Sequence, residues 1–221
     1  MKETTYHGIY ENERKLYTKS FAPGHILFGE SILTLDGAEY RHFDQTRSKL
    51  AAGVAKKAKQ LKIMQGDVVL YLGASHGYTV SFISDIVGEK GIIFAVDNAY
   101  KIFRTLFHTS NIRKNIVPIY ADASNPASYA KNICAVDVVY QDIGQKEQLE
   151  IFNENYNLYA KDGALGILAL KTGYADTAAP PEKIAEAVKK SIKLLGFRLL
   201  DAKSLDPFGK DHFLFIVTKK N

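Results

Sequence analysis

A glycine turn and two acids near the middle of the chain have the types and spacing of a nucleoside-binding site. The stretch Asp67–Thr79, DVVLYLGASHGYT, leads from an uncharged apolar run into Gly73 and Gly77. A buried strand that ends in such a turn and opens a helix brings free backbone N–H groups close to a ligand. Asp97 ends the next predicted strand, where an acid suits hydrogen bonds to ribose hydroxyls, and Asp122 ends the third, within reach of an adenine. A plain tight turn, with both acids capping the following helices, is the alternative.

Four more ionisable residues are expected at the same edge of the sheet. Asp142 and Lys171 end the fourth and fifth predicted parallel strands, and His212 begins an antiparallel strand that starts where the parallel strands stop. Lys49 stands near the N-terminal end of a helix of about sixteen residues, about 24 Å long, whose other end must feed the first strand. Ligands bind beyond the carboxyl ends of parallel strands, so we expect the four side chains to converge. Taken singly, each lysine is also explained as a solvated charge and His212 as a strand-end residue.

The predicted elements that would position these residues alternate between strand and helix. The strands are 68–72, 92–96, 116–120, 136–141 and 164–170, and the helices fall near 76–87, 99–111, 145–160 and 181–195. Such alternation predicts a parallel sheet with right-handed crossovers and helices on both faces. The last two strands, 197–203 and 212–218, are too close in the chain for a parallel crossover and must pair antiparallel. We therefore expect an α/β, Rossmann-like sheet of seven mostly parallel strands, which resembles the S-adenosylmethionine-dependent methyltransferase fold more than a nicotinamide dehydrogenase.

The first 43 residues differ from the rest and predict a small antiparallel sheet. Short alternating pieces are separated by turn residues, and these pieces are 8–10, 15–17, 25–28 and 32–35. Alternation between turns is typical of hairpins, and no helix is expected before Asp44. From about 46 to 61 the period becomes helical, with Asp44 or Thr46 as the cap and one apolar face made by Leu50, Val54, Ala58 and Leu61. We divide the chain into a small N-terminal β domain, 1–43, and a methyltransferase-like domain, 44–221.

The composition fits one α/β domain with a small appendage. The chain has 221 residues, 46% of them hydrophobic and 24% charged, which are ordinary values for a globular protein with a sizeable core. No apolar run approaches transmembrane length, and the N-terminus lacks a signal-peptide core. The single cysteine, Cys134, excludes an internal disulfide and fits a reducing compartment, so we expect a cytoplasmic protein. A net charge of +5 allows a polyanionic partner without proving one.

Two motifs are specific enough to indicate a family: Arg-Ser-Lys-Leu-Ala-Ala at 47–52 and Lys-Asp-His at 210–212. With the segments 39–41, 70–74, 115–119 and 137–145, they resemble the archaeal form of the fibrillarin family of RNA 2′-O-methyltransferases, over nearly the whole chain. By this resemblance the family's catalytic set falls on Lys49, Asp142, Lys171 and His212. Its S-adenosylmethionine positions fall on Gly73, Ala74, Gly77, Thr79, Asp97, Asn98, Asp122, Ala123, Asp142 and Gln145, and no metal site is implied.

The chain departs from the family pattern at a few of these positions. His76 stands where the family usually has a small Ser or Ala, and Tyr78 where it has Thr. The acid that closes the second strand is usually Glu followed by Phe, whereas here the pair is Asp97 and Asn98. Gln141 replaces a common acid. The changes in the glycine turn (His76 and Tyr78) and at the end of the second strand (Asp97 and Asn98) touch the expected cofactor pocket. None of the changes touches the catalytic set.

The resemblance implies a mechanism. A ribose 2′-hydroxyl must lose its proton as it attacks the methyl group, and Lys171 is our candidate for the general base, with burial and the like charge of Lys49 favouring its uncharged form. Asp142 would orient the ammonium group and the hydroxyl, and His212 would position the set or the ribose.

No familiar nucleic-acid-binding module is recognisable in the chain, so we expect partners to supply the RNA specificity. The resemblance implies which partners these are. They are a box C/D guide RNA, a target rRNA or tRNA, a Nop-domain scaffold protein and a kink-turn-binding protein, with no membrane. Two other functions stay open. A methyltransferase for a small molecule or a protein side chain would share the fold but would not need Lys49 and His212 together. A structural subunit of the same particle that has lost activity is suggested by the altered glycine turn, and it would fail to bind the methyl donor.

Overall fold

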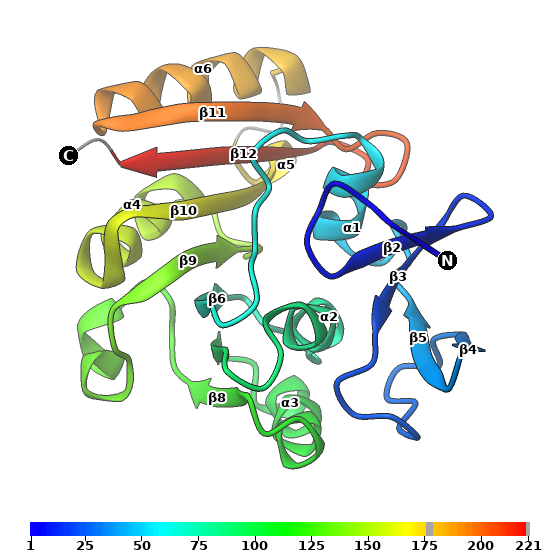
Figure 1. The fold of residues 1–221 in the computed structure, drawn as a ribbon. Coiled ribbons are helices and arrows are strands. Elements are labelled where there is room, and N and C mark those ends of the chain that lie inside the picture. Colours follow the sequence, from blue (N-terminus) through cyan, green and yellow to red (C-terminus); the bar gives the residue numbers. More distant parts are fainter. Residues whose placement is uncertain (176–178, 220–221) are drawn as a thin grey trace.

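The computed structural model describes residues 1–175 and 179–219 and contains two β-sheets, the larger one flanked by helices (Figure 1). The larger sheet consists of β6 (Val68–Leu72), β7 (Ile92–Asp97), β8 (Ile116–Tyr120), β9 (Val136–Gln141), β10 (Ala160–Lys171), β11 (Phe197–Ser204) and β12 (His212–Lys219). Its strand order is β11-β12-β10-β9-β6-β7-β8. The strands from β6 to β10 pair in parallel, whereas β12 runs antiparallel to both β10 and β11. This arrangement confirms the seven-stranded, mostly parallel sheet that the sequence predicts.

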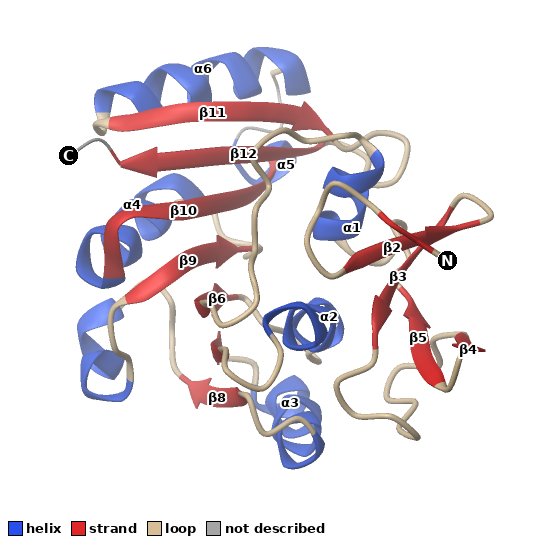
Figure 2. Ribbon diagram, in the orientation of Figure 1, coloured by secondary structure: helices blue, strands red, loops and turns tan. Residues whose placement is uncertain are grey.

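The helices cover both faces of this sheet (Figure 2). They are α1 (Lys49–Ala55), α2 (Tyr78–Val87), α3 (Tyr100–Ile112), α4 (Gln148–Tyr159), α5 (Thr172–Ala175) and α6 (Pro181–Leu194), with a 3-10 helix, η1, at Pro126–Asn132. Alternate residues of β6 face opposite sides, as the strand period requires. Val69 and Tyr71 pack with α1 and α2, while Leu70 and Leu72 pack with α4 and α6. No helix in the described ranges is long and apolar enough to cross a membrane.

The direction of strand addition reverses next to β6. The chain passes from β6 outward to β7 and β8, and then returns to place β9 on the other side of β6. In an open parallel sheet such a reversal leaves a crevice beyond the carboxyl ends of the two strands, where ligands bind. The sheet therefore positions a ligand site between the ends of β6 and β9.

The N-terminal residues form a five-stranded antiparallel sheet, as expected, although one predicted strand is wrong. The strands are β1 (Lys2–Glu3), β2 (Ile9–Asn12), β3 (Lys15–Lys19), β4 (Ile32–Leu35) and β5 (Ala38–His42), in the order β1-β2-β3-β5-β4. The segment 25–28, predicted as a strand, is a loop, in which Ile26 is 61% exposed and the Phe28 N–H donates to the carboxylate of Glu30. It has no neighbouring strand to pair with, because β4 pairs with β5, a strand that the alternation alone does not indicate.

Helix α1 is much shorter than the predicted helix at 46–61. It contains seven residues and is capped by Ser48 rather than by Asp44 or Thr46. Lys57 has a φ of 55°, in the left-handed region, and the Ala58 N–H donates to the Gly53 carbonyl, which closes the helix end. Ala58 and Leu61 are nevertheless buried, so the apolar periodicity marks burial in the loop beyond the helix as well as within it. The length of about 24 Å assumed for this helix is therefore wrong, and seven residues span only about 10 Å.

Buried ion pairs join the N-terminal sheet to α2 and to the end of α3. Arg41 of β5 pairs with Glu30 at 2.6 Å and with Asp85 of α2 at 2.7 Å, and Arg113 pairs with the other oxygen of Asp85 at 2.6 Å. We call these four residues the ionic core cluster. Ile9 and Leu16 of the small sheet also belong to the hydrophobic core that α1 and α2 share. The division at residues 43 and 44 stays a prediction, and the two parts share one core.

Candidate active site

Lys49, Asp142, Lys171 and His212 lie together at the carboxyl ends of the parallel strands, and we call them the strand-end cluster. Lys49 is the first residue of α1, Asp142 follows β9 directly, and Lys171 ends β10. His212 begins β12 and lies opposite Lys171 in the antiparallel register. The Nζ atom of Lys49 is 2.9 Å from Oδ2 of Asp142, and these side chains are 32% and 19% exposed. The topology thus brings together groups that are far apart in the chain and leaves them open to solvent.

The electrostatics of His212 show how close the four groups are. The pKa of His212 is lowered, mainly because the ring is partly buried. Its Nδ1–H donates to the Lys210 carbonyl at 2.7 Å, which opposes the shift. Lys49 and Lys171 lower the pKa further and Asp142 raises it. The ring is thus neutral near pH 7, with Nε2 as the nitrogen able to accept a proton.

The start of α1 is fixed by contacts to the start of α2. The Ser48 side chain caps α1 by accepting the Ala51 N–H, and the Thr79 hydroxyl donates to the Ser48 oxygen at 3.0 Å. Both side chains are buried. Since Thr79 follows the glycine turn, this bond locks Lys49 in place next to that turn. Thr79, which the resemblance gives as a cofactor contact, supports the cap of α1 and is not among the residues that line the cleft described below.

Gln148 holds the end of β10, a role that the sequence did not reveal. Its side-chain oxygen accepts the Lys171 N–H at 3.1 Å, and its side-chain nitrogen donates to the Lys171 carbonyl at 3.2 Å. Gln141 in turn donates to the Gln148 carbonyl at 2.5 Å. Both glutamines are buried. A glutamine at the first turn of a predicted helix carries no signal of this role, because the contact depends on the neighbouring strand.

A cleft of about 270 Å³ opens at the switch between β6 and β9, next to the strand-end cluster. Of the predicted cofactor residues, those that line it are Gly73, Asp97, Asn98, Ala123, Asp142 and Gln145. Its other lining residues, which the motifs did not indicate, are Ser75, Val96, Ala99, Ile102, Ala121, Ile143 and Gly144. All of these are near chain neighbours of predicted residues, so that neighbourhood is the signal that could have found them. Asp142 belongs to both the cleft and the strand-end cluster.

The two acids at the ends of β7 and β8 take different positions. Asp97 lines the cleft, and its carboxylate accepts the Ser75 N–H and the Ala99 N–H, each at 2.8 Å. The second bond closes the start of α3, so the capping role and the cleft position coexist. Asp122 lies outside the residues that line the cleft. Its carboxylate accepts the backbone and hydroxyl of Ser124, and the backbone bond is the main cause of its lowered pKa.

The glycines of the turn are required by the backbone. Gly73 has a φ of 79°, and a Cβ there would lie 2.3 Å from the Asp142 carbonyl oxygen. Gly77 has a φ of 93° and stands at the N-cap of α2, where a Cβ would lie 3.1 Å from Leu106. Gly73 thus permits the close approach of the β6 and β9 ends that forms the cleft. Gly77 and Ala74, both predicted cofactor residues, are not among the residues that line it.

The departures at His76 and Tyr78 lie away from the cleft. His76 is exposed and contacts the Ser75 hydroxyl through Nδ1 at 3.2 Å. The Tyr78 ring makes an edge contact with Phe28 at 5.7 Å, and the guanidinium of Arg47 lies 4.1 Å over it. Neither side chain lines the cleft. The larger ring at position 78 therefore fills the space between α2 and the N-terminal loop.

This arrangement has the components of a proton-transfer site beside a nucleoside cleft. Asp97 uses one bond on each oxygen, so its carboxylate keeps lone pairs for ribose hydroxyls. Ile102 and Ile143 supply apolar wall for a flat ring. At the rim, an amine, a carboxylate and a neutral imidazole can bind a hydroxyl group and take its proton.

Three comparisons with known proteins agree on the family. A family model described as Fibrillarin matches residues 1–221. A fibrillarin-like rRNA/tRNA 2′-O-methyltransferase of Thermococcus onnurineus is 35% identical over 224 residues, which is 99% of each chain.

Solved structures give the same result. A fibrillarin of Aeropyrum pernix in complex with natively bound S-adenosyl-L-methionine has a TM-score of 0.90 and 34% identity, over 98% of this chain and 96% of that one. A fibrillarin/Nop5p complex contains a chain with a TM-score of 0.89 and 36% identity, over 99% of this chain and 100% of that one.

Proposed function

This chain belongs to the fibrillarin family, and we propose that it transfers a methyl group from S-adenosylmethionine to a ribose 2′-hydroxyl of RNA. The match over the whole chain confirms the resemblance inferred from the motifs. The observation that carries the proposal is the Lys49–Asp142 ion pair at 2.9 Å, because Asp142 also lines the cleft at the strand switch. A charged, half-open cluster that shares a residue with a nucleoside-sized cleft fits transfer between a bound nucleoside and a hydroxyl at its rim.

The cleft residues fit S-adenosylmethionine. Asp97 would hold the ribose hydroxyls, and the amides of Asn98 and Gln145 offer further polar contacts at the cleft wall. Ile102 and Ile143 would lie against the adenine. When bound, the donor supplies a methyl group on a positively charged sulfur, which carries the difficult chemistry itself. The bound donor of the Aeropyrum pernix fibrillarin, a similar chain, supports the assignment.

The strand-end cluster would bind and deprotonate the RNA hydroxyl. We assign Lys171 as the general base. It ends β10, and the Gln148 side chain bonds to both its N–H and its carbonyl group. Asp142, paired with Lys49, would orient the hydroxyl toward the methyl group. His212, neutral near pH 7, would position the ribose. Each step uses a group that the fold holds at the same rim, so alignment contributes much of the rate.

Partners would supply the RNA specificity. The net charge of +5 is modest, and phosphate contacts alone bind RNA with little sequence preference. The fibrillarin/Nop5p complex contains a chain similar to this one, which supports a Nop-domain scaffold as a partner. We extend the assembly to a box C/D guide RNA, its rRNA or tRNA target and a kink-turn-binding protein.

The test compares 2′-O-methylation of a guide-matched RNA by the chain alone and after addition of the scaffold proteins and guide RNA. We expect efficient, site-selective transfer from the assembled particle and weak, unselective transfer from the chain alone. Equal and selective transfer by the isolated chain would contradict the need for partners. No transfer by the particle, with no donor binding at millimolar concentration, would identify an inactive structural subunit instead.

A further inference from the structure

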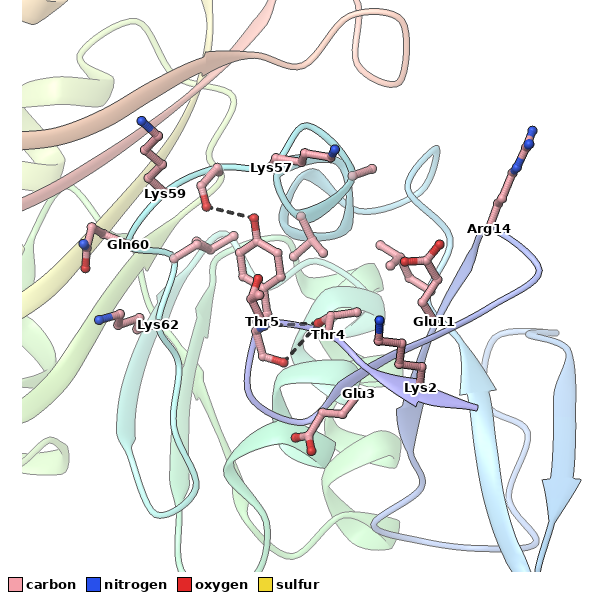
Figure 3. A pocket seen from close by; sticks show the side chains of 16 residues that line it. Lys2, Glu3, Thr4, Thr5, Glu11, Arg14, Lys57, Lys59, Gln60 and Lys62 are labelled. Atoms are coloured by element: carbon pink, nitrogen blue, oxygen red, sulfur yellow. Dashed lines mark hydrogen bonds between the residues drawn. The ribbon is translucent and has the colours of Figure 1, made fainter.

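A concave surface with a larger volume than the cleft lies outside the active site. It is a groove of about 910 Å³ between the N-terminal strands and the chain that follows α1. Its walls contain five basic residues, Lys2, Arg14, Lys57, Lys59 and Lys62, and two acidic residues, Glu3 and Glu11. Figure 3 shows Lys57, Lys59 and Lys62 on the wall after α1, with Lys2 on the facing strand. We propose that this groove binds the sugar-phosphate backbone of the RNA on which the active site acts.

The basic side chains are spread over both walls of the groove, and their heads point in different directions (Figure 3). Its basic residues outnumber its acidic residues by three, whereas the whole chain has a net charge of only +5. Among the described ion pairs, none involves any of these five basic side chains. Cations without a partner carboxylate are free to replace the counterions of a polyanion, which is the main source of affinity for nucleic-acid backbones.

The wall that carries three of the lysines is held in place by the rest of the fold. The Tyr6 hydroxyl donates to the Ala58 carbonyl at 3.0 Å across the groove floor. The Lys59 N–H donates to the Asp201 carboxylate at 2.6 Å, which ties the same segment to β11. Lys57 and Gln60 both have left-handed φ values, 55° and 59°. The lysines are thus presented on a fixed backbone, so binding would order little more than their side chains.

The groove connects to the strand-end cluster through α1. The groove is lined by Val54 and Ala55, which stand at the C-terminal end of this helix, whereas Lys49 is the first residue of the helix. Seven helical residues span about 10 Å, which corresponds to about three nucleotides along a helical strand. Lys56 also donates to the Asp206 carbonyl at 2.7 Å, in the loop that leads to His212. The residues of α1 from Leu50 to Val54 are buried, so an RNA strand with its target ribose at the cluster would pass over the surface beside the helix to reach the groove. The short distance between the two sites favours RNA over an acidic protein as the occupant.

The inference rests on the proposed function, and its test measures RNA binding separately from methyl transfer. The probe is a fluorescent single-stranded RNA of mixed sequence, and its affinity for the full chain is measured by anisotropy over a range of salt concentrations. The variant is Lys57→Gln with Lys62→Gln. The matched control is Lys190→Gln with Lys193→Gln, which removes the same charge from the exposed surface of α6. Thermal unfolding establishes that both variants are folded.

We expect the groove variant to reduce the slope of log affinity against log salt by about 0.7 for each phosphate that the chain no longer neutralises, and the control to leave the slope unchanged. In the assembled particle, the groove variant should raise KM for RNA and leave kcat and donor affinity as they are. Equal slopes for the groove variant and the unmodified chain would overturn the proposal, as would no binding at the lowest salt. If polyglutamate displaced the bound RNA as readily as unlabelled RNA does, the groove would be assigned to an acidic protein instead. In each of these cases, methyl transfer by the assembled particle still tests the proposed function, because that measurement does not depend on the groove.

Discussion

The ionic core cluster and the strand-end cluster contain the same kinds of charge but differ in how completely those charges are enclosed. In the ionic core cluster, the side chains of Arg41, Asp85 and Arg113 are 0% exposed. In the strand-end cluster, the paired side chains of Lys49 and Asp142 remain partly open to solvent. One cluster joins the N-terminal sheet to α2 and α3, and the other lies at the rim of a cleft.

The bonding of Asp85 explains why the buried cluster is structural. One carboxylate oxygen accepts from Arg113 and the Phe21 N–H, and the other accepts from Arg41 and the Thr18 hydroxyl. A carboxylate has about four acceptor positions, so protein groups fill all of them. Asp142, in contrast, lines a cleft and can meet a ligand. Charge alone therefore does not indicate a functional site, and the difference lies in whether the bonding capacity is already used inside the fold.

The largest effect should come from breaking the buried cluster. Asp85→Asn leaves the guanidinium groups of Arg41 and Arg113 without their shared carboxylate in a solvent-free environment. We expect the free energy of unfolding to fall by about 3–5 kcal/mol, measured by urea denaturation. Glu186→Gln, which removes a surface ion pair with Lys189 whose side chains are 65% and 33% exposed, is the control and should change little. A loss no larger than the control's would mean that the ionic core cluster does not hold the N-terminal sheet against α2 and α3.

The strand-end cluster should respond in the opposite way, in rate rather than in stability. Lys171→Ala should reduce single-turnover methyl transfer by at least about 100-fold, because a positioned general base contributes about 10²–10⁴-fold. Donor binding should change little, since Lys171 is not among the residues that line the cleft. Lys190→Ala removes an exposed lysine from the surface of α6, outside the cleft and the strand-end cluster, and is the control. A wild-type rate in the Lys171 variant would show that the general-base assignment is wrong.

The sheet could be predicted from the sequence because its signals are local. Short apolar runs such as Val68–Leu72 predict buried strands without reference to the rest of the chain. Helix α1 could not be predicted to its end, because Ala58 and Leu61 keep helical spacing and are buried in a loop. The segment 25–28 alternates like a strand, and only the pairing of β4 with β5 shows that it is not one.

The strand-end cluster was predictable for a topological reason, since parallel strands end at one edge. The sequence argument placed Lys49 at this edge, and the structure has it there, although the helix length used in that argument is wrong. The ionic core cluster was not predictable, because Arg41, Asp85 and Arg113 stand on distant segments and burial of charge leaves no periodic signal. The hold of Gln148 on Lys171 is likewise visible only once α4 is packed beside β10.

A smaller effect is expected at the cleft, and it separates the two acids there. Asp97→Ala should weaken S-adenosylmethionine binding by about 1–3 kcal/mol, the cost of a polar contact left unmade, as measured by calorimetry. Asp122→Ala should weaken it less, because the Asp122 carboxylate already accepts from Ser124 and from the Asn98 amide and does not itself line the cleft. Equal losses in the two variants would contradict this distinction and restore Asp122 as a direct contact of the donor.

The smallest effect concerns His212, and it tests whether the open cluster contributes to stability at all. Burial is the main cause of the lowered pKa of His212, and Lys49 and Lys171 add to it against the Lys210 carbonyl and Asp142. An unfolded histidine titrates near 6.5. As the pH falls through that value, the unfolded chain therefore takes up a proton before the folded one does, and the folded state loses stability.

The measurement is the free energy of unfolding between about pH 5 and pH 8 for the unmodified chain and for His212→Gln. Above about pH 6.5 the imidazole is neutral in both states, so the contribution of its titration is complete there and is lost on the acid side. The variant has no such group, and its stability should fall less over the same window. The other titrating groups, His42 among them, are present in both proteins, so the difference between the two curves reports the titration of His212 together with its coupling to Asp142. Parallel curves would mean that the imidazole is as free in the folded chain as in the unfolded one, which would place it outside the cluster that the geometry assigns to it.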